Sequence, residues 1–171
     1  MTSGSDSQTW LDGVVIEPMV PDDLEEVLAI ERRAFPSAWS RASYERELRS
    51  VNTYYFVARS AGVLVGYTGM WIVYDEAHVT TIAVHPQWRR RGLATRLMSM
   101  LIALARRDGA AKLTLEVRER NQAALALYRK LAFEEKGLLP GYYGDTGENG
   151  IVMWRPLLPP ASAPPDRREA P

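Results

Sequence analysis

The chain has 171 residues, of which 46% are hydrophobic and 25% charged, and its 21 basic side chains balance its 21 acidic ones. Zero net charge gives no general attraction to nucleic acid, and no apolar run approaches the roughly 20 residues that cross a bilayer, so we expect no direct nucleic-acid or membrane partner. The sequence has no cysteine and only two histidines, and its N-terminus does not resemble a signal peptide, so we expect no metal site and a cytoplasmic location.

The length suits one domain with a tail at each end, because single domains commonly run to about 100–200 residues. Residues 1–13 are small and polar, and residues 158–171 are rich in proline. Both compositions are typical of disordered segments. We therefore expect a folded domain at residues 14–157 between two disordered tails.

The first half of the domain predicts one strand, two helices and three antiparallel strands. In the first helix, Leu24, Val27, Leu28 and Glu31 recur at helical spacing, and Pro36 ends it. Ser40 is placed to cap the second helix. The expected strands are residues 14–16, 53–59, 63–74 and 77–84, and the expected helices are residues 24–35 and 41–48.

The second half predicts helix, strand, helix and two short strands. Thr114 and Glu116 share the less apolar face of their strand, and Asn121 is placed to cap the helix after it. The glycine-rich segment 137–150 is expected to be a mobile loop. The expected helices are residues 93–107 and 122–133, and the expected strands are residues 112–118, 133–136 and 151–154. This order favours an α/β fold, an α+β mixed sheet with parallel character around the helix at 93–107.

Residues 79–94 read as a strand, an exit at Pro86 and a basic turn that opens a helix. Such a turn presents backbone N–H groups and the positive end of the helix dipole, which suit a phosphate. It contains neither the Gly-Lys-Ser/Thr end of a Walker A loop nor a three-glycine dinucleotide fingerprint. Considered alone, the turn is equally consistent with a solvated basic surface.

Residues 89–94, Arg-Arg-Arg-Gly-Leu-Ala, resemble the acyl-CoA signature of the GNAT acetyltransferases. The closest resemblance is to the RimI-type enzymes, which acetylate the N-terminal amine of a small-subunit ribosomal protein. The resemblance covers nearly all of residues 14–154. It is carried by Phe35-Pro36, Trp39-Ser40, Asp75-Glu76-Ala77, Ile82-Ala83-Val84, Arg90-Arg91-Gly92-Leu93, Leu115-Glu116-Val117-Arg118, Asn121, Ala126-Leu127-Tyr128 and Tyr142-Tyr143.

The resemblance implies a GNAT fold, with a mostly antiparallel sheet splayed at the cofactor cleft and about four helices. It also implies that acetyl-CoA is the cosubstrate and that Asn121 contacts it. The pantetheine arm would pair with the backbone of Ile82, Ala83 and Val84. The pyrophosphate would lie on the amides of residues 89–94, which are Arg89, Arg90, Arg91, Gly92, Leu93 and Ala94.

Two side chains are candidates for the acid–base chemistry. An N-terminal amine has a pKa of about 8, so a modest base is enough to deprotonate it, and Glu116 near the end of its strand is the candidate. The alternative for Glu116 is an ion pair with Arg118 or Lys112. By resemblance Tyr128 is the general acid beside the sulfur, and its alternative is a core aromatic.

The candidate acceptor-binding residues are Tyr142 and Tyr143 in the glycine-rich loop, Phe35 and Trp39 on an opposite lip, and Glu76. Simple packing of the aromatics is the alternative, and Glu76 is equally consistent with a turn acid. His78 and His85 receive no role. By resemblance, Ala132 replaces a glycine where a left-handed residue is expected, and Asn149-Gly150 replaces Asp-Ala.

The predicted function is transfer of an acetyl group to a protein N-terminus, on a ribosomal protein, directly within a ternary complex. Two alternatives stay open. One is acetylation of lysine or a small amine, and the other is an acyl-CoA-binding module without catalysis.

Overall fold

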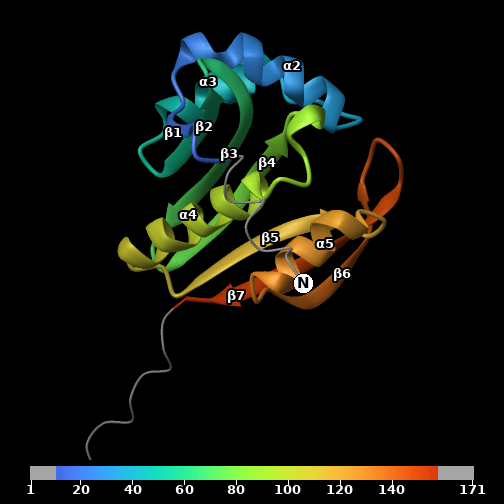
Figure 1. Ribbon diagram of the computed structural model, residues 1–171. Helices are drawn as coiled ribbons and strands as arrows, with labels where there is room; N and C mark the ends of the chain where they lie inside the picture. Colours follow the sequence, from blue (N-terminus) through green and yellow to red (C-terminus); the bar gives the residue numbers. More distant parts are fainter. Residues whose placement is uncertain (1–10, 158–171) are drawn as a thin grey trace, which may run out of the picture.

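The computed structural model describes residues 11–157, which form a seven-stranded sheet covered by four α-helices (Figure 1). The strands are β1 (Val14–Pro18), β2 (Thr53–Ser60), β3 (Val63–Val73), β4 (Glu76–Val84), β5 (Lys112–Arg118), β6 (Glu134–Tyr143) and β7 (Glu148–Pro156). The helices are α2 (Leu24–Ala34), α3 (Arg41–Arg49), α4 (Leu93–Arg107) and α5 (Gln122–Lys130), with short 3-10 turns η1 (Pro21–Asp23) and η2 (Pro86–Trp88). The predicted fold class is confirmed.

The sheet has the order β1-β2-β3-β4-β5-β7-β6, and β4 with β5 is its parallel pair. These two strands pair only through Glu76–His78 and Lys112–Thr114. Past that point each continues without a partner in the other, β4 to Val84 and β5 to Arg118. The sheet therefore opens between β4 and β5, as the family resemblance implied.

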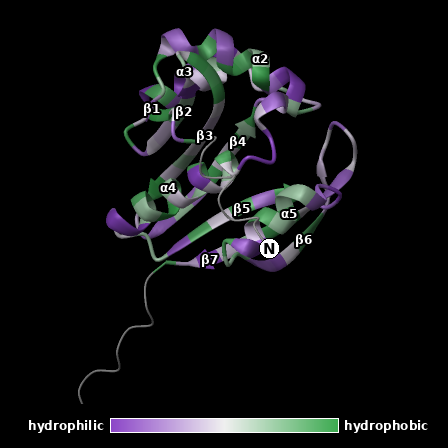
Figure 2. Cartoon of the chain, viewed as in Figure 1, coloured by the Kyte–Doolittle hydropathy of each residue, from purple (hydrophilic) through white to green (hydrophobic). Residues whose placement is uncertain are grey.

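Two layers of helices cover opposite faces of the sheet. Val57 and Tyr67 are buried against α2 and α3, whereas Ala58 and Val65 on the same two strands are buried with the start of α4. The alternation follows from the period of two along a strand. Figure 2 shows hydrophobic and hydrophilic residues alternating along α2 and α4, as expected for helices with one buried face.

The two predicted N-caps, Ser40 and Asn121, are confirmed. The Ser40 hydroxyl oxygen accepts a hydrogen bond from Ser43 N–H, and Asn121 Oδ1 accepts one from Ala124 N–H. Of the predicted tails at 1–13 and 158–171, residues 1–10 and 158–171 lie outside the described residues. Residues 11–13 form a turn in which Leu11 O accepts from Val14 N–H.

The prediction of a loop at residues 137–150 is wrong, because most of that segment is strand. β6 runs to Tyr143 and β7 starts at Glu148, which leaves a turn of four residues. The glycines are accommodated by irregular pairing between Leu139 and Tyr143, where Gly141 has a φ of +59°. Glycine in a strand often marks such a bulge, so glycine content alone does not indicate a loop.

Helix α5 also differs from its prediction. It ends at Lys130, three residues early, because Ala132 adopts a φ of +63° and turns the chain toward β6. The left-handed conformation expected at Ala132 is thus confirmed. The buried residues of α5 are Leu125 and Tyr128, whereas Ala124 is only partly buried.

Candidate active site

Glu116 and His78 meet where β4 and β5 separate. Glu116 Oε2 lies 2.9 Å from His78 Nε2, and the two side chains are 26% and 17% exposed. His78 pairs in register with Thr114, and Glu116 follows two residues later on the same face of β5. The fork of the sheet therefore fixes both side chains at its mouth. No role was predicted for His78, and its partner turns out to be the predicted base.

The hydrogen-bond partners of His78 place a proton on Nε2. Nδ1 lies 2.7 Å from Thr114 Oγ1, and the Thr114 hydroxyl is also 3.4 Å from Ala77 O. Because a carboxylate oxygen only accepts, the 2.9 Å contact with Glu116 requires a proton on Nε2. The ring also stacks on Trp71 at 5.2 Å between centroids, which holds its plane.

Tyr128 packs on the face of the sheet opposite Glu116. Its ring is 6% exposed and packs in the same cluster as Leu115 and Val117, which point away from the Glu116 face. Burial, with a smaller contribution from nearby Tyr143, raises the pKa of Tyr128 well above its usual value. The phenol is therefore protonated at neutral pH. Tyr128 can accordingly pack in the core and still carry a proton to donate.

Tyr142 and Tyr143 end β6 and stand at the Glu116 side of the fork. The Glu116 charge contributes to the raised pKa of both phenols, after burial as the largest cause. The two rings contact edge to face at 5.1 Å. Glu116 therefore lies near both phenols, and Tyr143 in turn lies near Tyr128.

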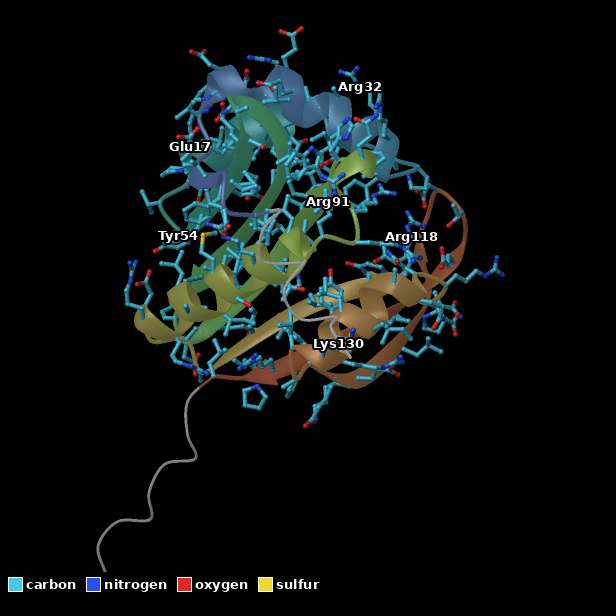
Figure 3. All side chains as sticks on the ribbon, viewed as in Figure 1. Glu17, Arg32, Tyr54, Arg91, Arg118 and Lys130 are labelled. Atoms are coloured by element: carbon cyan, nitrogen blue, oxygen red, sulfur yellow. The ribbon has the colours of Figure 1, made fainter. Side chains whose placement is uncertain are left out.

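Arg118 fixes the turn between β6 and β7 to the end of β5. Its guanidinium donates to Asp145 Oδ2 at 2.8 Å and lies 4.0 Å from the centre of the Tyr143 ring. The backbone N–H of Arg120 donates to Glu148, 2.9 Å away. Figure 3 labels Arg118 beside this turn. The turn is thus held by charged contacts, in contrast with the mobile loop expected from its glycines.

The basic turn ends at the start of α4. Gly92 is the N-terminal cap of that helix with a φ of +83°, and a glycine offers no side-chain acceptor to the first N–H groups of the helix. Arg90 is also left-handed, with a φ of +62°. Successive backbone N–H groups in a turn of this kind can form a concave anion-binding site.

The arginines of this turn differ in their surroundings. Arg89 Nε donates to Val84 O at 3.3 Å, which ties the turn back to β4. The Arg91 guanidinium lies 4.9 Å from the Trp88 ring centre, and Figure 3 labels it above the fork. Arg90 is exposed. The predicted phosphate residues thus lie together at the start of α4.

The part of β4 beyond His78 carries a bulge. Gly69 pairs with Thr81 and Met70 with Val79, so Thr80 has no partner in β3. Ile82, Ala83 and Val84 follow on the side that β5 has left. A bulge shifts the strand and re-aims its backbone groups. The predicted pantetheine segment is therefore a strand edge without a β5 partner.

Three predicted acceptor residues do not join this cluster by direct contact. Glu76 lies at the closed end of the fork, where its carboxylate is 3.9 Å from Lys112 Nζ, so the turn-acid alternative describes its surroundings better. Phe35 and Trp39 are half-buried and pack against the core of α2 and α3. Figure 1 places the connection between α2 and α3, and the β6–β7 turn, at the same end of the molecule.

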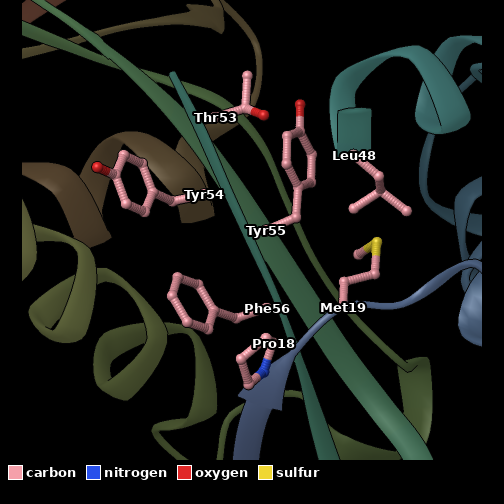
Figure 4. Close-up of a pocket in the computed structure, with 7 residues that line it drawn as sticks. All are labelled: Pro18, Met19, Leu48, Thr53, Tyr54, Tyr55 and Phe56. Carbon is pink, nitrogen blue, oxygen red and sulfur yellow. The ribbon is translucent and has the colours of Figure 1, made fainter. Parts of the chain in front are cut away.

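A separate hollow of about 240 Å³ shares no residue with the predicted site. It straddles the edge of β2 next to the end of β1, which pairs only as far as Pro18 with Phe56. Figure 4 shows Tyr54 and Phe56 on one side of β2 and Tyr55 on the other, which is why the hollow is an interrupted sheet edge and not a deep pocket. We assign no function to it.

Among residues 11–157 no group of three or more metal-ligating side chains is found. In the same part of the chain, none of the helices has the length and apolar character required to span a membrane.

Comparisons with known proteins identify the class of this fold. The model of the acetyltransferase (GNAT) family matches residues 24–133, and the chain belongs to that family. Members of the family use acetyl-CoA, so the protein is an acetyl-CoA-dependent acetyltransferase.

Similar proteins within the family include RimI-type N-acetyltransferases. A putative ribosomal protein bS18-alanine N-acetyltransferase of Bacillus subtilis is 37% identical over 134 residues, 78% of this chain and 89% of the relative. N-alpha-acetyltransferase RimI of Mycobacterium tuberculosis is 36% identical over 83% of this chain and 92% of its own. The crystal structure of the ribosomal-protein-S18-alanine N-acetyltransferase from Escherichia coli has a TM-score of 0.79 at 32% identity, covering 90% and 97% of the two chains. The predicted recognition and enzyme class are confirmed.

Proposed function

We propose that the protein acetylates the N-terminal α-amine of a ribosomal protein by direct transfer from acetyl-CoA. The observation that carries the chemistry is the Glu116–His78 pair at the fork, with Tyr128 on the opposite face. The choice of acceptor is supported by the relatives, which are named for alanine acetylation of ribosomal protein bS18.

Glu116 is the proposed base. The acceptor amine arrives as an ammonium with a pKa of about 8 and has to lose a proton before its lone pair can attack the thioester carbon. Because His78 Nε2–H donates to Glu116, the carboxylate is held in one orientation at the mouth of the fork. His78 acts here as a positioning residue for Glu116.

Tyr128 is the proposed acid. When the new C–N bond forms, the C–S bond breaks and its electron pair remains on sulfur, which then takes a proton. The raised pKa keeps the Tyr128 phenol protonated and available for that transfer. The N–H groups at the start of α4 are proposed to bind the pyrophosphate and the edge of β4 to bind the pantetheine arm, while Asn121 is proposed to contact CoA beside its capping role.

Acetylation assays with defined peptides test this function. Peptides with a free N-terminal alanine or serine and no lysine should be acetylated, whereas peptides with a blocked N-terminus and one internal lysine should not. Exclusive labelling of lysine peptides would refute the N-terminal assignment. Tight acetyl-CoA binding without turnover on any amine would indicate a binding module.

A further inference from the structure

Glu31 is a buried carboxylate that the proposed chemistry does not use. It lies on α2 at the apolar spacing of that helix, and the residue is only 2% exposed. A buried carboxylate is costly unless it is hydrogen-bonded, so its partners show what it holds. It has no basic partner among the residues that the structure describes.

Three donors from three different segments meet at Glu31. Oε1 accepts a hydrogen bond from Trp39 N–H at 3.1 Å. Oε2 accepts one from the Tyr44 hydroxyl at 2.8 Å and another from the Tyr67 hydroxyl. Trp39 belongs to the connection between α2 and α3, Tyr44 to α3 and Tyr67 to β3. One carboxylate therefore ties the lip, residues 35–39, to a helix and to the sheet.

The same cluster reaches β4, the strand that carries His78. The Tyr44 ring lies 5.4 Å from the Trp39 ring and 6.1 Å from the Tyr55 ring, between centroids. The Tyr55 hydroxyl is 2.8 Å from Thr80 Oγ1, at the bulge of β4 two residues after His78. Tyr55 fits only because its ring covers Gly69, where a Cβ would come within 2.2 Å. The contacts form a continuous path from the lip to the fork.

We propose that Glu31 is a positioning residue that fixes the lip, and that the fixed lip in turn binds the acceptor peptide. The second half of this proposal rests on the proposed function. Residues 36–39, between the caps of α2 and α3, belong to no helix or strand. The hydrogen bond from Trp39 N–H to the Glu31 carboxylate anchors the C-terminal end of the lip. The hydrogen bond from Phe35 N–H to Glu31 O anchors its N-terminal end.

A carboxylate suits this position because all three partners are donors. Its two oxygens only accept, so each donor is satisfied at once. A glutamine would turn one NH2 group toward donors and leave one of them poorly paired. The site is therefore expected to discriminate between Glu and Gln, which have nearly the same shape.

The test compares Glu31→Gln and Glu31→Leu with Glu25→Gln, a control on the exposed side of the same helix. The steady-state KM for the N-terminal peptide is expected to rise about tenfold in Glu31→Leu and less in Glu31→Gln, which corresponds to loss of a charged hydrogen bond. The KM for acetyl-CoA should stay within about twofold of the unaltered value, because the proposed pyrophosphate site at the start of α4 does not contact Glu31. Glu25→Gln should change neither constant.

Hydrogen exchange on the same samples measures the anchor without any substrate. Amides of residues 37–40 should exchange faster in both Glu31 variants, with α4 and β5 unchanged. The proposal is overturned if Glu31→Gln has the same amide exchange rates at residues 37–40 and the same peptide KM as the unaltered protein. That outcome decides the matter even if Glu31→Leu fails to fold. Absence of peptide acetylation by the unaltered protein refutes the proposed function and the peptide role of the lip, whereas the exchange measurement still decides the anchoring.

Discussion

At the scale of single residues, a neighbouring imidazole fixes the position of Glu116. Its strand alternation gives it the less apolar face, and the family resemblance named it as base, but neither indicated the imidazole that holds it. His78 is one of two histidines in the chain, and it belongs to no sequence motif that would indicate a role for it. Only the register of β4 with β5 brings it within 2.9 Å of the carboxylate, and that register is a long-range property.

Replacing Glu116 by Gln should slow peptide acetylation most at low pH. Below about pH 8 the acceptor is an ammonium that needs a base, and a general base contributes roughly 100-fold or more. The loss should shrink above that pH, where the amine deprotonates unaided. Measured pH profiles of kcat/KM test this, and a pH-independent loss would count against the assignment.

His78→Ala should slow the reaction through Glu116 and not independently of it. In a double-mutant cycle with Glu116→Gln, we therefore expect the two losses not to add. His85→Ala is the matched control, because within residues 11–157 the hydrogen bond of the His85 ring is the one it accepts from Gln87 N–H at the η2 turn. Additive effects of His78 and Glu116 would show that the imidazole has a separate task.

Tyr128→Phe should lower kcat about 100-fold while acetyl-CoA binding changes little, since the ring is retained and only the proton donor is lost. Calorimetric titration and single-turnover kinetics separate the two effects. Equal kcat in the variant and the unaltered enzyme would leave Tyr128 with its packing role alone.

At the scale of elements, local signals predicted the helices and misjudged the last hairpin. Caps at Ser40 and Asn121 depend on neighbours three residues away, so the sequence displays them directly. The strand at Gly137–Tyr143 depends on β7 lying beside it, which no local pattern displays. Tyr142 and Tyr143 were thus found as candidates and placed in the wrong kind of element.

The end of α5 offers a test of backbone strain. Ala132→Gly should stabilise the protein by roughly 0.5–1 kcal/mol, because a left-handed alanine is strained and the gain is partly offset by glycine's extra chain entropy. The same change at exposed Ala126, inside the helix, should cost about 1 kcal/mol. Urea unfolding of both variants measures the two signs, and destabilisation by both would contradict the strain at Ala132.

At the scale of the whole molecule, buried tyrosines couple stability to alkaline pH. Burial is the first cause that raises the pKa of Tyr44, Tyr55, Tyr67 and Tyr128, and it raises the pKa of Tyr143 to about 12. The unfolded chain loses these protons from about pH 10, before the folded one does. The folded state then binds more protons, so its stability is complete below pH 10 and falls as pH rises.

We therefore expect the free energy of unfolding to be flat from pH 8 to about 10 and to fall steeply above it. Tyr44→Phe should reduce that slope by up to about 1.4 kcal/mol per pH unit, because one proton no longer takes part. Urea titrations at closely spaced pH values measure both slopes. A slope unchanged by Tyr44→Phe would mean that this phenol ionises alike in both states.

The short parallel seam between β4 and β5 has a consequence for the lifetime of the protein in the cell. Three residue pairs join the strands on either side of the opening, so little backbone bonding ties β5–β7 to β1–β4. A thioester that lies in the opening and contacts both sides would link the two parts of the sheet and stabilise the folded state. At one hundred times its dissociation constant, such a ligand adds about 2.7 kcal/mol to the folded state. We expect the abundance of this enzyme, and not only its rate, to follow the metabolic supply of acetyl groups.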